Sequence, residues 1–177
     1  YTNQSFPSVS GANSYLTVTY YDDYAWYGTP TVIDNYFNSL KNQFSSHGLT
    51  GATVPVINKF DRVKGQITGT KEKVLDNTNI WLASIVFYDD RYRPILTRSY
   101  NYVGGEDIVL NHYDFPGKLM ESWHCHTTNL ASPGKRIVRH KYDYDHAGRL
   151  LTTKQQMTGA TQLVTIAANS YNELGQL

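Results

Sequence analysis

The sequence predicts a mainly β protein, an antiparallel twisted sheet of successive β-hairpins with one short helix in its N-terminal half. Three observations favour this fold class. The 177 residues include 15 tyrosines, and many Thr and Val residues accompany them, the residue types that are enriched in strands. A short turn-forming motif recurs four times in the second half, as expected when one supersecondary unit is stacked repeatedly. A single segment of the first half has apolar residues at helical spacing.

The first half of the chain is the less regular one. Residues 1–14 are polar and rich in turn formers, so we expect an irregular start. Apolar side chains then recur at helical spacing between residues 33 and 47, namely at Ile33, Phe37, Leu40 and Phe44. We expect a helix there, with Asp34 capping its start and Gly48 closing its end. The strands expected in this half cover residues 15–21, 54–60 and 65–74.

The second half reads as one hairpin after another, with short runs rich in β-branched and aromatic residues separated by turn formers. The strands expected there cover residues 80–88, 94–102, 108–113, 118–126, 136–143, 149–157 and 163–171. We therefore divide the chain into an N-terminal region, residues 1–79, and a hairpin array, residues 80–177, which together are expected to form one continuous domain.

The recurring motif is a tyrosine, an acid or amide, turn formers, a basic or polar residue and an aliphatic one. Its copies cover residues 88–95, 113–119, 144–150 and 171–177, and successive copies begin 25, 31 and 27 residues apart. In the clearest copy, Asp145 suits the first position of a turn, because its carboxylate can accept backbone N–H groups two or three residues on. Gly148 suits the left-handed position that follows, and Tyr144 and Leu150 flank the turn. The residues assigned this turn-forming role are Tyr88, Asp89, Tyr113, Asp114, Gly117, Tyr144, Asp145, Gly148, Tyr171, Asn172 and Gly175.

The copies differ in ways that affect the predicted turns. Asn172 can make the same side-chain bond as an aspartate. Pro116 disfavours the ordinary type I turn at its position, so a different turn or a cis bond is expected there. Tyr92 stands where glycine is wanted, so a different loop or register is expected in the first copy. A fifth, degenerate copy begins at residues 21–23, after the first alternating strand.

These copies resemble the Rhs/YD-repeat family, large surface or secreted bacterial proteins with relatives among the animal teneurins. The family motif is Tyr-Asp, two variable residues, Gly, Arg or Lys, then Leu. Residues 113–119 and 144–150 match it closely, residues 171–177 match in part, and residues 88–95 keep Tyr-Asp but lose the glycine. Residues 81–89 look like the region just before the repeats in long Bacteroidetes-type members, which would make this chain a fragment that covers the start of the repeats.

The resemblance implies a β-sheet that spirals into a hollow shell and encloses or displays a variable C-terminal toxin or adhesive domain. On this basis we expect a non-catalytic structural segment in an extracellular or cell-surface protein. Its partners would be the remainder of its parent chain or a downstream toxin or adhesive domain. The family's aspartyl self-cleaving core is not seen here, and the chain stops at Leu177, just after a turn. We therefore expect an excised fragment or a truncated gene product, whose cut edge could pair with a second copy.

Composition excludes several classes of function. Sixteen basic and 15 acidic residues give a formal net charge of +1, which offers no electrostatic case for binding nucleic acid or acidic membranes. No apolar run approaches the roughly 20 residues of a membrane helix. The single cysteine excludes an internal disulfide. We expect no cofactor and no catalytic residue.

A few residues suggest chemistry, although each has a simpler structural explanation. His124 and His126 would point to the same side of a strand and could share a metal with His112 or His140, but this spacing supplies only two ligands. Cys125 between them is typical of a small core residue. The acidic pairs at residues 22–23 and 89–90 are typical of turn initiation rather than of paired catalytic carboxylates or a calcium loop.

The alternative function is a carbohydrate- or receptor-binding adhesive module. Trp26 and Trp123 are the candidates for stacking on a ligand, because indole faces serve that purpose. Trp26 belongs to an aromatic series, Tyr20, Tyr21, Tyr24, Trp26 and Tyr27, which could equally cover a sheet face. The arginines at positions 91, 93 and 98 are expected to form a solvated strand face.

Overall fold

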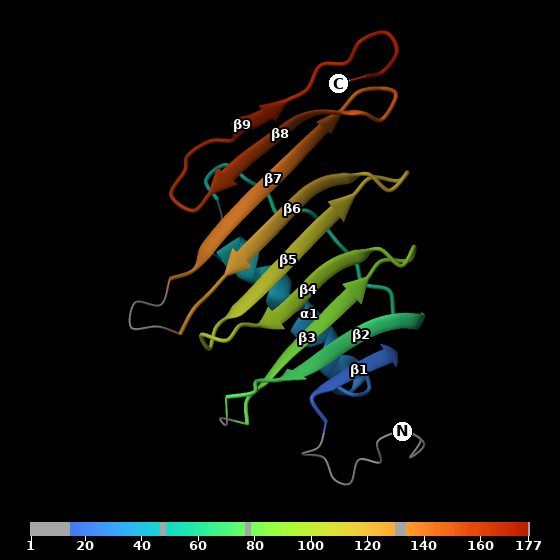
Figure 1. The fold of residues 1–177 in the computed structure, drawn as a ribbon, viewed down its shortest axis with the longest axis vertical. Helices are drawn as coiled ribbons and strands as arrows, with labels where there is room; N and C mark the ends of the chain where they lie inside the picture. Colours follow the sequence, from blue (N-terminus) through green and yellow to red (C-terminus); the bar gives the residue numbers. More distant parts are fainter. Residues whose placement is uncertain (1–14, 47–48, 77–78, 130–133, 177) are drawn as a thin grey trace.

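The computed structural model describes residues 15–46, 49–76, 79–129 and 134–176. Its strands form one sheet in the order β1 to β9, each strand antiparallel to the next (Figure 1). The strands are β1 (Thr17–Asp22), β2 (Val63–Lys73), β3 (Trp81–Tyr88), β4 (Pro94–Tyr100), β5 (Glu106–Tyr113), β6 (Leu119–His126), β7 (Arg136–Tyr144), β8 (Leu150–Met157) and β9 (Val164–Ala168). The predicted sheet of successive antiparallel hairpins is confirmed.

The predicted helix is confirmed as α1 (Pro30–Ser46). It begins earlier than expected, because proline is well suited to the first helical turn. Asp34 therefore lies in the second turn, where it does not cap the start and instead pairs with Lys59 (2.8 Å from Nζ to Oδ1). The expected end at Gly48 and the expected irregular start at residues 1–14 fall outside the described residues.

One expected strand, residues 54–60, is absent, and the chain there runs back without regular structure beneath the helix. Ile57 is buried (5% exposed) while its neighbour Val56 is 84% exposed, so the alternation that resembled a strand reflects packing against α1. The segment reaches the sheet through the amide of Phe60, which donates to the carbonyl of Tyr88 (2.8 Å).

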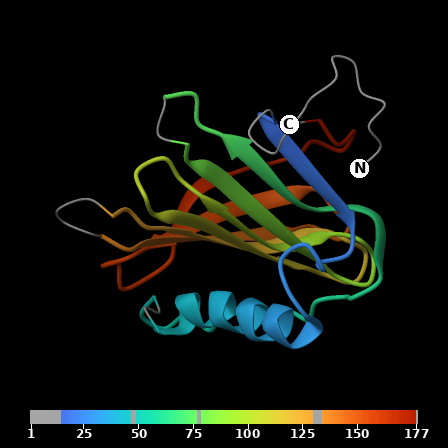
Figure 2. The ribbon, with the colours of Figure 1, turned by 90° about the horizontal axis from the view of Figure 1, so that it is seen from below.

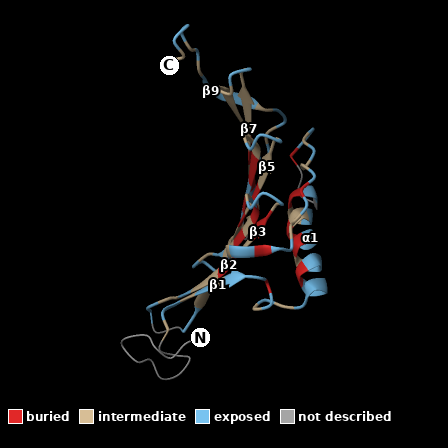
Figure 3. Ribbon diagram, turned by 90° about the vertical axis from the view of Figure 1, so that its right-hand side faces the viewer, coloured by how far each residue is buried: buried red, intermediate tan, exposed pale blue. Residues whose placement is uncertain are grey.

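The helix lies across one face of the sheet, and both ends of the sheet curve away from it, so α1 occupies the convex face (Figures 2 and 3). The buried helix residues are the four that the spacing indicated: Ile33, Phe37, Leu40 and Phe44. Phe37 meets Phe87 edge to face at 5.2 Å, and Phe44 meets Trp123 in the same way at 6.3 Å. Each fully buried side chain of this size contributes roughly 1.5–3 kcal/mol, so this helix–sheet interface is the core of the protein.

Two buried ion pairs lie among the apolar side chains of the convex face. Arg98 Nε is 2.9 Å from Glu106 Oε2, and Arg139 Nη2 is 2.7 Å from Glu121 Oε1. The expectation that Arg98 lies on a solvated face is wrong, because its side chain shares the convex face with Ile108, its partner in β5, and is only 6% exposed. Among the described residues no helix is long and apolar enough to span a bilayer.

Candidate functional site: the row of Tyr-Asp turns

The recurring motif forms turns that lie at the same end of successive strand pairs, and we call each copy a Tyr-Asp turn. Three of them join β3 to β4, β5 to β6 and β7 to β8, and the fourth follows β9 (Figure 1). In each, the acid or amide residue donates its amide to the carbonyl four residues on: Asp89 to Arg93 (3.1 Å), Asp114 to Lys118 (3.0 Å), Asp145 to Arg149 (3.0 Å) and Asn172 to Gln176 (3.0 Å). The four turns therefore share one backbone geometry.

The register beside these turns is also shared. Each tyrosine lies opposite the residue six positions on, in the pairs Tyr88 with Pro94, Tyr113 with Leu119 and Tyr144 with Leu150. A bulge follows each pair, because the next partners skip one residue on the second strand. Such a bulge increases the local twist, and its recurrence at every second connection fits the curvature of the sheet.

The acid of each turn closes the loop with its side chain. Asp145 Oδ1 accepts the amide of Arg149 (2.8 Å), and its Oδ2 accepts Nε of the same residue (2.7 Å). In the fourth turn, Asn172 Oδ1 accepts the amides of Leu174 (3.0 Å) and Gln176 (2.9 Å). A single side chain thus fixes both halves of the turn, which is why an acid or an asparagine is needed at this position.

Two turns contain a residue that was expected to change them, Pro116 in the second turn and Tyr92 in the first. Pro116 has no N–H, and in its turn Asp114 Oδ1 accepts the amides of Gly117 (2.8 Å) and Lys118 (2.7 Å), while the backbone bonds of the turn are those of the other copies. The expectation of a different loop or register around Tyr92 is wrong, because Tyr92 adopts the left-handed conformation itself (φ 60°). The side-chain bonds of Asp89 to the amides of Arg91 and Arg93 (both 2.9 Å) close this loop around it.

Hydrogen bonds displace the pKa values of the turn carboxyls. Burial alone would raise the pKa of Asp89, but the backbone and side-chain bonds from Arg93 outweigh it and hold that pKa below its ordinary value. The backbone bond from Arg149, opposed by slight desolvation and aided by its guanidinium, lowers the pKa of Asp145. Both groups are therefore ionised in the folded protein at neutral pH.

These depressed pKa values predict a loss of stability in acid. A carboxyl whose pKa is lower in the folded state stabilises the protein above its unfolded pKa, near 4, and this contribution disappears as the pH falls through the folded value. We expect urea midpoints to decrease below about pH 4, and to decrease less steeply in Asp145→Asn, which keeps the acceptor oxygen as Asn172 does but cannot titrate. Asp90→Asn, at an exposed residue of the first turn, removes the same charge and is the control. Identical slopes for Asp145→Asn and the parent would contradict the prediction.

Neighbouring turns are connected by their tyrosines. Each tyrosine hydroxyl donates to the carbonyl of the seventh residue of the preceding turn: Tyr113 to Pro94 (3.2 Å), Tyr144 to Leu119 (2.9 Å) and Tyr171 to Leu150 (2.9 Å). Sequence reasoning placed these rings at the turns but did not find this bond, because the residues that it joins are about 20 positions apart.

The tyrosine of a turn contacts the turn before it, whereas the basic residue of each of the first three turns contacts the turn after it. Arg93 lies over the ring of Tyr113 (4.9 Å to the centroid), Lys118 over Tyr144 (5.5 Å) and Arg149 over Tyr171 (4.7 Å). These are cation–π distances. The Tyr, basic and aliphatic positions of the motif therefore form the interface between successive hairpins, in addition to the turn itself.

The glycine of the motif is needed chiefly for its left-handed backbone conformation. Gly148 has φ 86°, and a Cβ added there would lie 2.9 Å from the amine of Lys118, which reaches over from the preceding turn. We expect Gly148→Ala to lower the free energy of unfolding by about 1–2 kcal/mol. Ala147→Ser in the same turn should change it by less than about 0.5 kcal/mol. Chemical denaturation measures both changes, and equal effects would show that this backbone position does not require glycine.

The candidate metal ligands have separate partners. His124 Nε2 is 3.0 Å from Ser122 Oγ, and His126 Nδ1 is 2.5 Å from Asp107 Oδ1. His140 is edge-on to His124 at 5.9 Å, and burial together with His140 lowers the pKa of His124. His112 lies on the opposite, convex face beside Ile57. In the described part of the chain no group of three or more His, Cys, Asp or Glu residues could hold a metal.

Cys125 is a core residue. Its side chain is 1% exposed, and burial raises the pKa of its thiol, so the thiolate that a nucleophile requires is disfavoured.

The two candidate stacking tryptophans differ in position. Trp123 is fully buried and cannot stack on a ligand, so its assignment as a stacking residue is wrong; its Nε1 donates to Glu121 (3.0 Å) within the core. Trp26 is half-buried, stacks on Tyr20 at 4.3 Å and lies against Gly69, where an added Cβ would come 2.0 Å from its ring. A shallow cavity of about 260 Å³ lies beside it, lined by Trp26, Tyr27, Lys71, Ala83, Ser84, Ile85, Arg98 and Tyr100.

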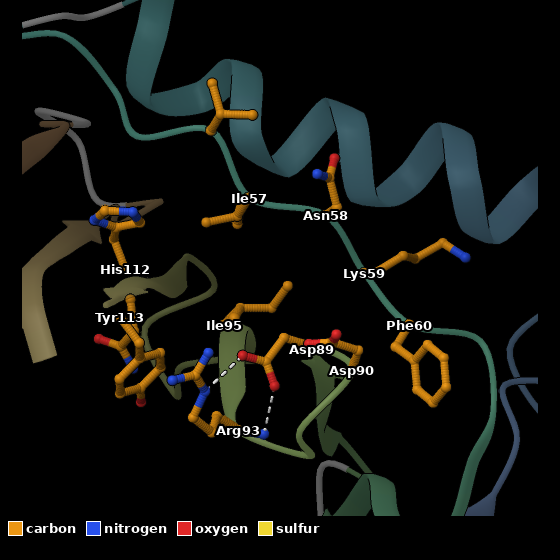
Figure 4. Close-up of a pocket in the computed structure, with 12 residues that line it drawn as sticks. Ile57, Asn58, Lys59, Phe60, Asp89, Asp90, Arg93, Ile95, His112 and Tyr113 are labelled. Atoms are coloured by element: carbon orange, nitrogen blue, oxygen red, sulfur yellow. Dashed lines mark hydrogen bonds and ion pairs between the residues drawn. The ribbon is translucent and has the colours of Figure 1, made fainter. Parts of the chain in front are cut away.

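A larger cavity of about 400 Å³ separates the returning segment beneath α1 from the first Tyr-Asp turn (Figure 4). Asp89 and Arg93 lie together on its wall, joined at 2.6 Å, while the side chain of Lys59 points away from them. Lys59 pairs with Asp34 and Asp61. Asp89, Arg93 and Lys59 are therefore committed to structural ion pairs, and the row of turns remains the most developed feature of the described structure.

The fold and the shared turns define a β-hairpin repeat array with a helix on its convex face. Comparison with protein-family models, with curated proteins and with solved structures finds no match for this chain.

Proposed function

We propose that this chain is a non-catalytic structural segment of a YD-repeat shell or scaffold, in a bacterial surface or secreted protein that contains or displays a downstream domain. The observation that carries the proposal is the bonding between turns. The same hydroxyl-to-carbonyl bond and the same cation–π contact recur from one hairpin to the next. The motif is repeated within the chain, and its repeated residues contact the next hairpin rather than line a pocket. A wall built from stacked units requires such contacts between neighbouring units.

The curvature of the sheet supports the same function. Its ends bend away from the helix, so the face opposite α1 is concave (Figure 3). The side chains of β9, at the last edge, are all exposed, and an open edge strand is a template for further pairing. In a longer chain the next strand would pair with β9 and extend the curved wall around its contents.

Electron cryo-microscopy of a longer parent chain that carries this segment tests the proposal. We expect a further strand paired with β9 after the turn at residues 171–176, and a sheet that continues to bend toward its concave side. A parent protein in which no further strand pairs with the outer edge of β9, or in which an unrelated domain covers the concave face of the sheet and leaves no enclosed space, would overturn the proposal.

The mechanics of the array can be tested in the chain itself with double-mutant cycles. Arg93→Met and Tyr113→Leu remove two groups in contact, and we expect a coupling energy of about 0.5–1 kcal/mol. Arg93→Met and Tyr171→Leu remove groups from turns that are not neighbours, and their effects should add within about 0.5 kcal/mol. Coupling of equal size in both pairs would contradict a nearest-neighbour array.

A second function, carbohydrate binding, is favoured by the cavity beside Trp26. Its walls include the half-exposed rings of Tyr27 and Tyr100, and aromatic faces of this kind stack on sugar rings. A glycan array tests it, with Tyr27→Ala and Tyr100→Ala as variants of the cavity and Tyr102→Ala, an exposed ring outside it, as the control. Binding that only the first two variants abolish would establish this function, whereas no binding by the parent protein would exclude it for the glycans on the array.

A further inference from the structure

The connection from β1 to β2 differs from every other connection in the sheet, because 40 residues including α1 separate strands that are direct neighbours. We infer that residues 21–22 and 65–67 are the two halves of a fifth Tyr-Asp turn, and that residues 23–64 are an insert carried by that turn. The insert replaces the two central residues of the motif and folds its helix over the convex face of the array.

The strand register is the first support. Tyr21 lies opposite Ile67, and the preceding pair, Tyr20 with Gly69, skips Thr68 on the second strand. This is the bulge found beside the intact turns, where Tyr88 lies opposite Pro94 and the preceding pair skips one residue. Tyr21 and Ile67 therefore hold the first and seventh positions of the motif, which makes Asp22 the acid and Gly65 the glycine.

The side chains and backbone at those positions agree with this assignment. Asp22 Oδ1 accepts the amide of Gly65 (2.6 Å), as Asp114 Oδ1 accepts that of Gly117 in the second turn (2.8 Å). Gly65 has φ 82°, close to the 86° of Gly148. The acid and glycine positions are thus hydrogen-bonded to each other although the insert separates them in sequence.

The contact with the next turn is the second, independent support. The hydroxyl of Tyr88 donates to the carbonyl of Ile67 (2.7 Å). This is the bond by which each later tyrosine meets the seventh residue of the turn before it. The array therefore begins at β1, and its first hairpin interface is made in the same way as the others, although the polypeptide leaves that turn at Asp22 and returns at Gly65.

Asp22 departs from the intact turns in one respect. It has φ 73°, which directs the chain out of the strand and toward the insert. The acids of the complete turns are not among the residues with positive φ in the described chain. The insert then passes along the convex face, where α1 buries its apolar side against Phe87 and Trp123, and comes back to the same turn. The closure of a Tyr-Asp turn thus does not require a continuous short loop.

The missing basic residue supplies a test that should increase stability. Gln66 holds the sixth position, where Arg93, Lys118 and Arg149 stand in the other turns, each over the next tyrosine ring. We expect Gln66→Arg to raise Tm by about 2 °C, because the guanidinium can contact the ring of Tyr88 and the carboxylate of Asp22. Lys64→Arg, two residues away and inside the insert, should leave Tm unchanged. No rise for Gln66→Arg, or an equal rise for Lys64→Arg, would overturn the assignment of position six.

A second test asks whether an intact turn can also carry an insert. His146 and Ala147 are replaced by a flexible Gly/Ser segment of about 12 residues, and the control places the same segment within β8, between Thr152 and Thr153. Since the entropy of closing a loop grows slowly with its length, the first variant should keep hydrogen-exchange protection of the β7–β8 amides with a modest decrease in Tm. The control should lose protection of β8 and β9. Equal loss of protection in both variants would show that a split turn cannot close, and would overturn the inference.

Discussion

Trp123→Ala is expected to lower the free energy of unfolding by about 3–5 kcal/mol, as large-to-small changes of buried aromatic residues do. Trp123 is the largest of the fully buried side chains. It meets Phe44 of α1 on one side and lies beneath the guanidinium of Arg139 (5.1 Å from Cζ to the ring centroid) on the other. Its removal leaves a cavity between α1 and the sheet. Urea denaturation followed by far-UV circular dichroism measures the change.

The matched control for this substitution is Phe115→Ala. Phe115 is an aromatic residue in the second Tyr-Asp turn and is 82% exposed, so its loss should change the free energy of unfolding by less than about 0.5 kcal/mol. A Trp123→Ala variant as stable as Phe115→Ala would mean that the indole does not hold the helix to the sheet, and would reopen its assignment as a ligand-stacking residue.

Glu106→Ala should have an effect of similar size, about 3–5 kcal/mol, for a different reason. Breaking a buried ion pair by removing one partner leaves the other charge without compensation. The side chain of Arg98 is 7% exposed and that of Glu106 is 20% exposed, and Glu106 also accepts a bond from Gln43 of the helix (3.2 Å). The substitution therefore strands a guanidinium beneath α1 and removes a link between helix and sheet. Thermal and urea denaturation both report the loss.

The double variant Arg98→Met with Glu106→Leu distinguishes a stranded charge from a simple loss of contacts. Replacing both partners by apolar residues of similar volume is often neutral or stabilising, so we expect the double variant to recover most of the stability that Glu106→Ala loses. A double variant that is no more stable than Glu106→Ala would show that the arginine is not a buried charge in need of a partner.

The convex face shows what the sequence could and could not predict. The hairpins, the helix and its four buried residues followed from spacing alone, because turn chemistry and apolar periodicity are local properties. Which face of the sheet the helix would cover was not predictable, since Arg98 and Trp123 alternate with polar neighbours in a way that either face could accommodate. Arg98 was consequently expected in solvent and Trp123 at a surface, and both lie beneath α1.

The row of turns likewise shows that local contacts could be predicted from the sequence and contacts between hairpins could not. The bonds within each turn follow from the motif, since Asp145 and Gly148 are three residues apart. The bonds between turns join residues from different hairpins, such as Tyr144 and Leu119, and only a known register reveals them. Tyr92 was expected to change its loop because of its backbone preference, whereas the side-chain bonds of Asp89 impose the left-handed conformation upon it.

The succession of neighbours in the sheet has a consequence for how the chain folds. Every strand from β2 to β8 pairs with the strand that follows it in sequence, so strands that are consecutive in the chain are neighbours in the sheet, and such a topology favours faster folding than one with long crossovers. Each hairpin can form beside its predecessor before later ones exist. The exception is the pairing of β1 with β2, which must close over the helix segment. We therefore expect the slowest kinetic phase to report the ordering of β1, after the rest of the array has assembled.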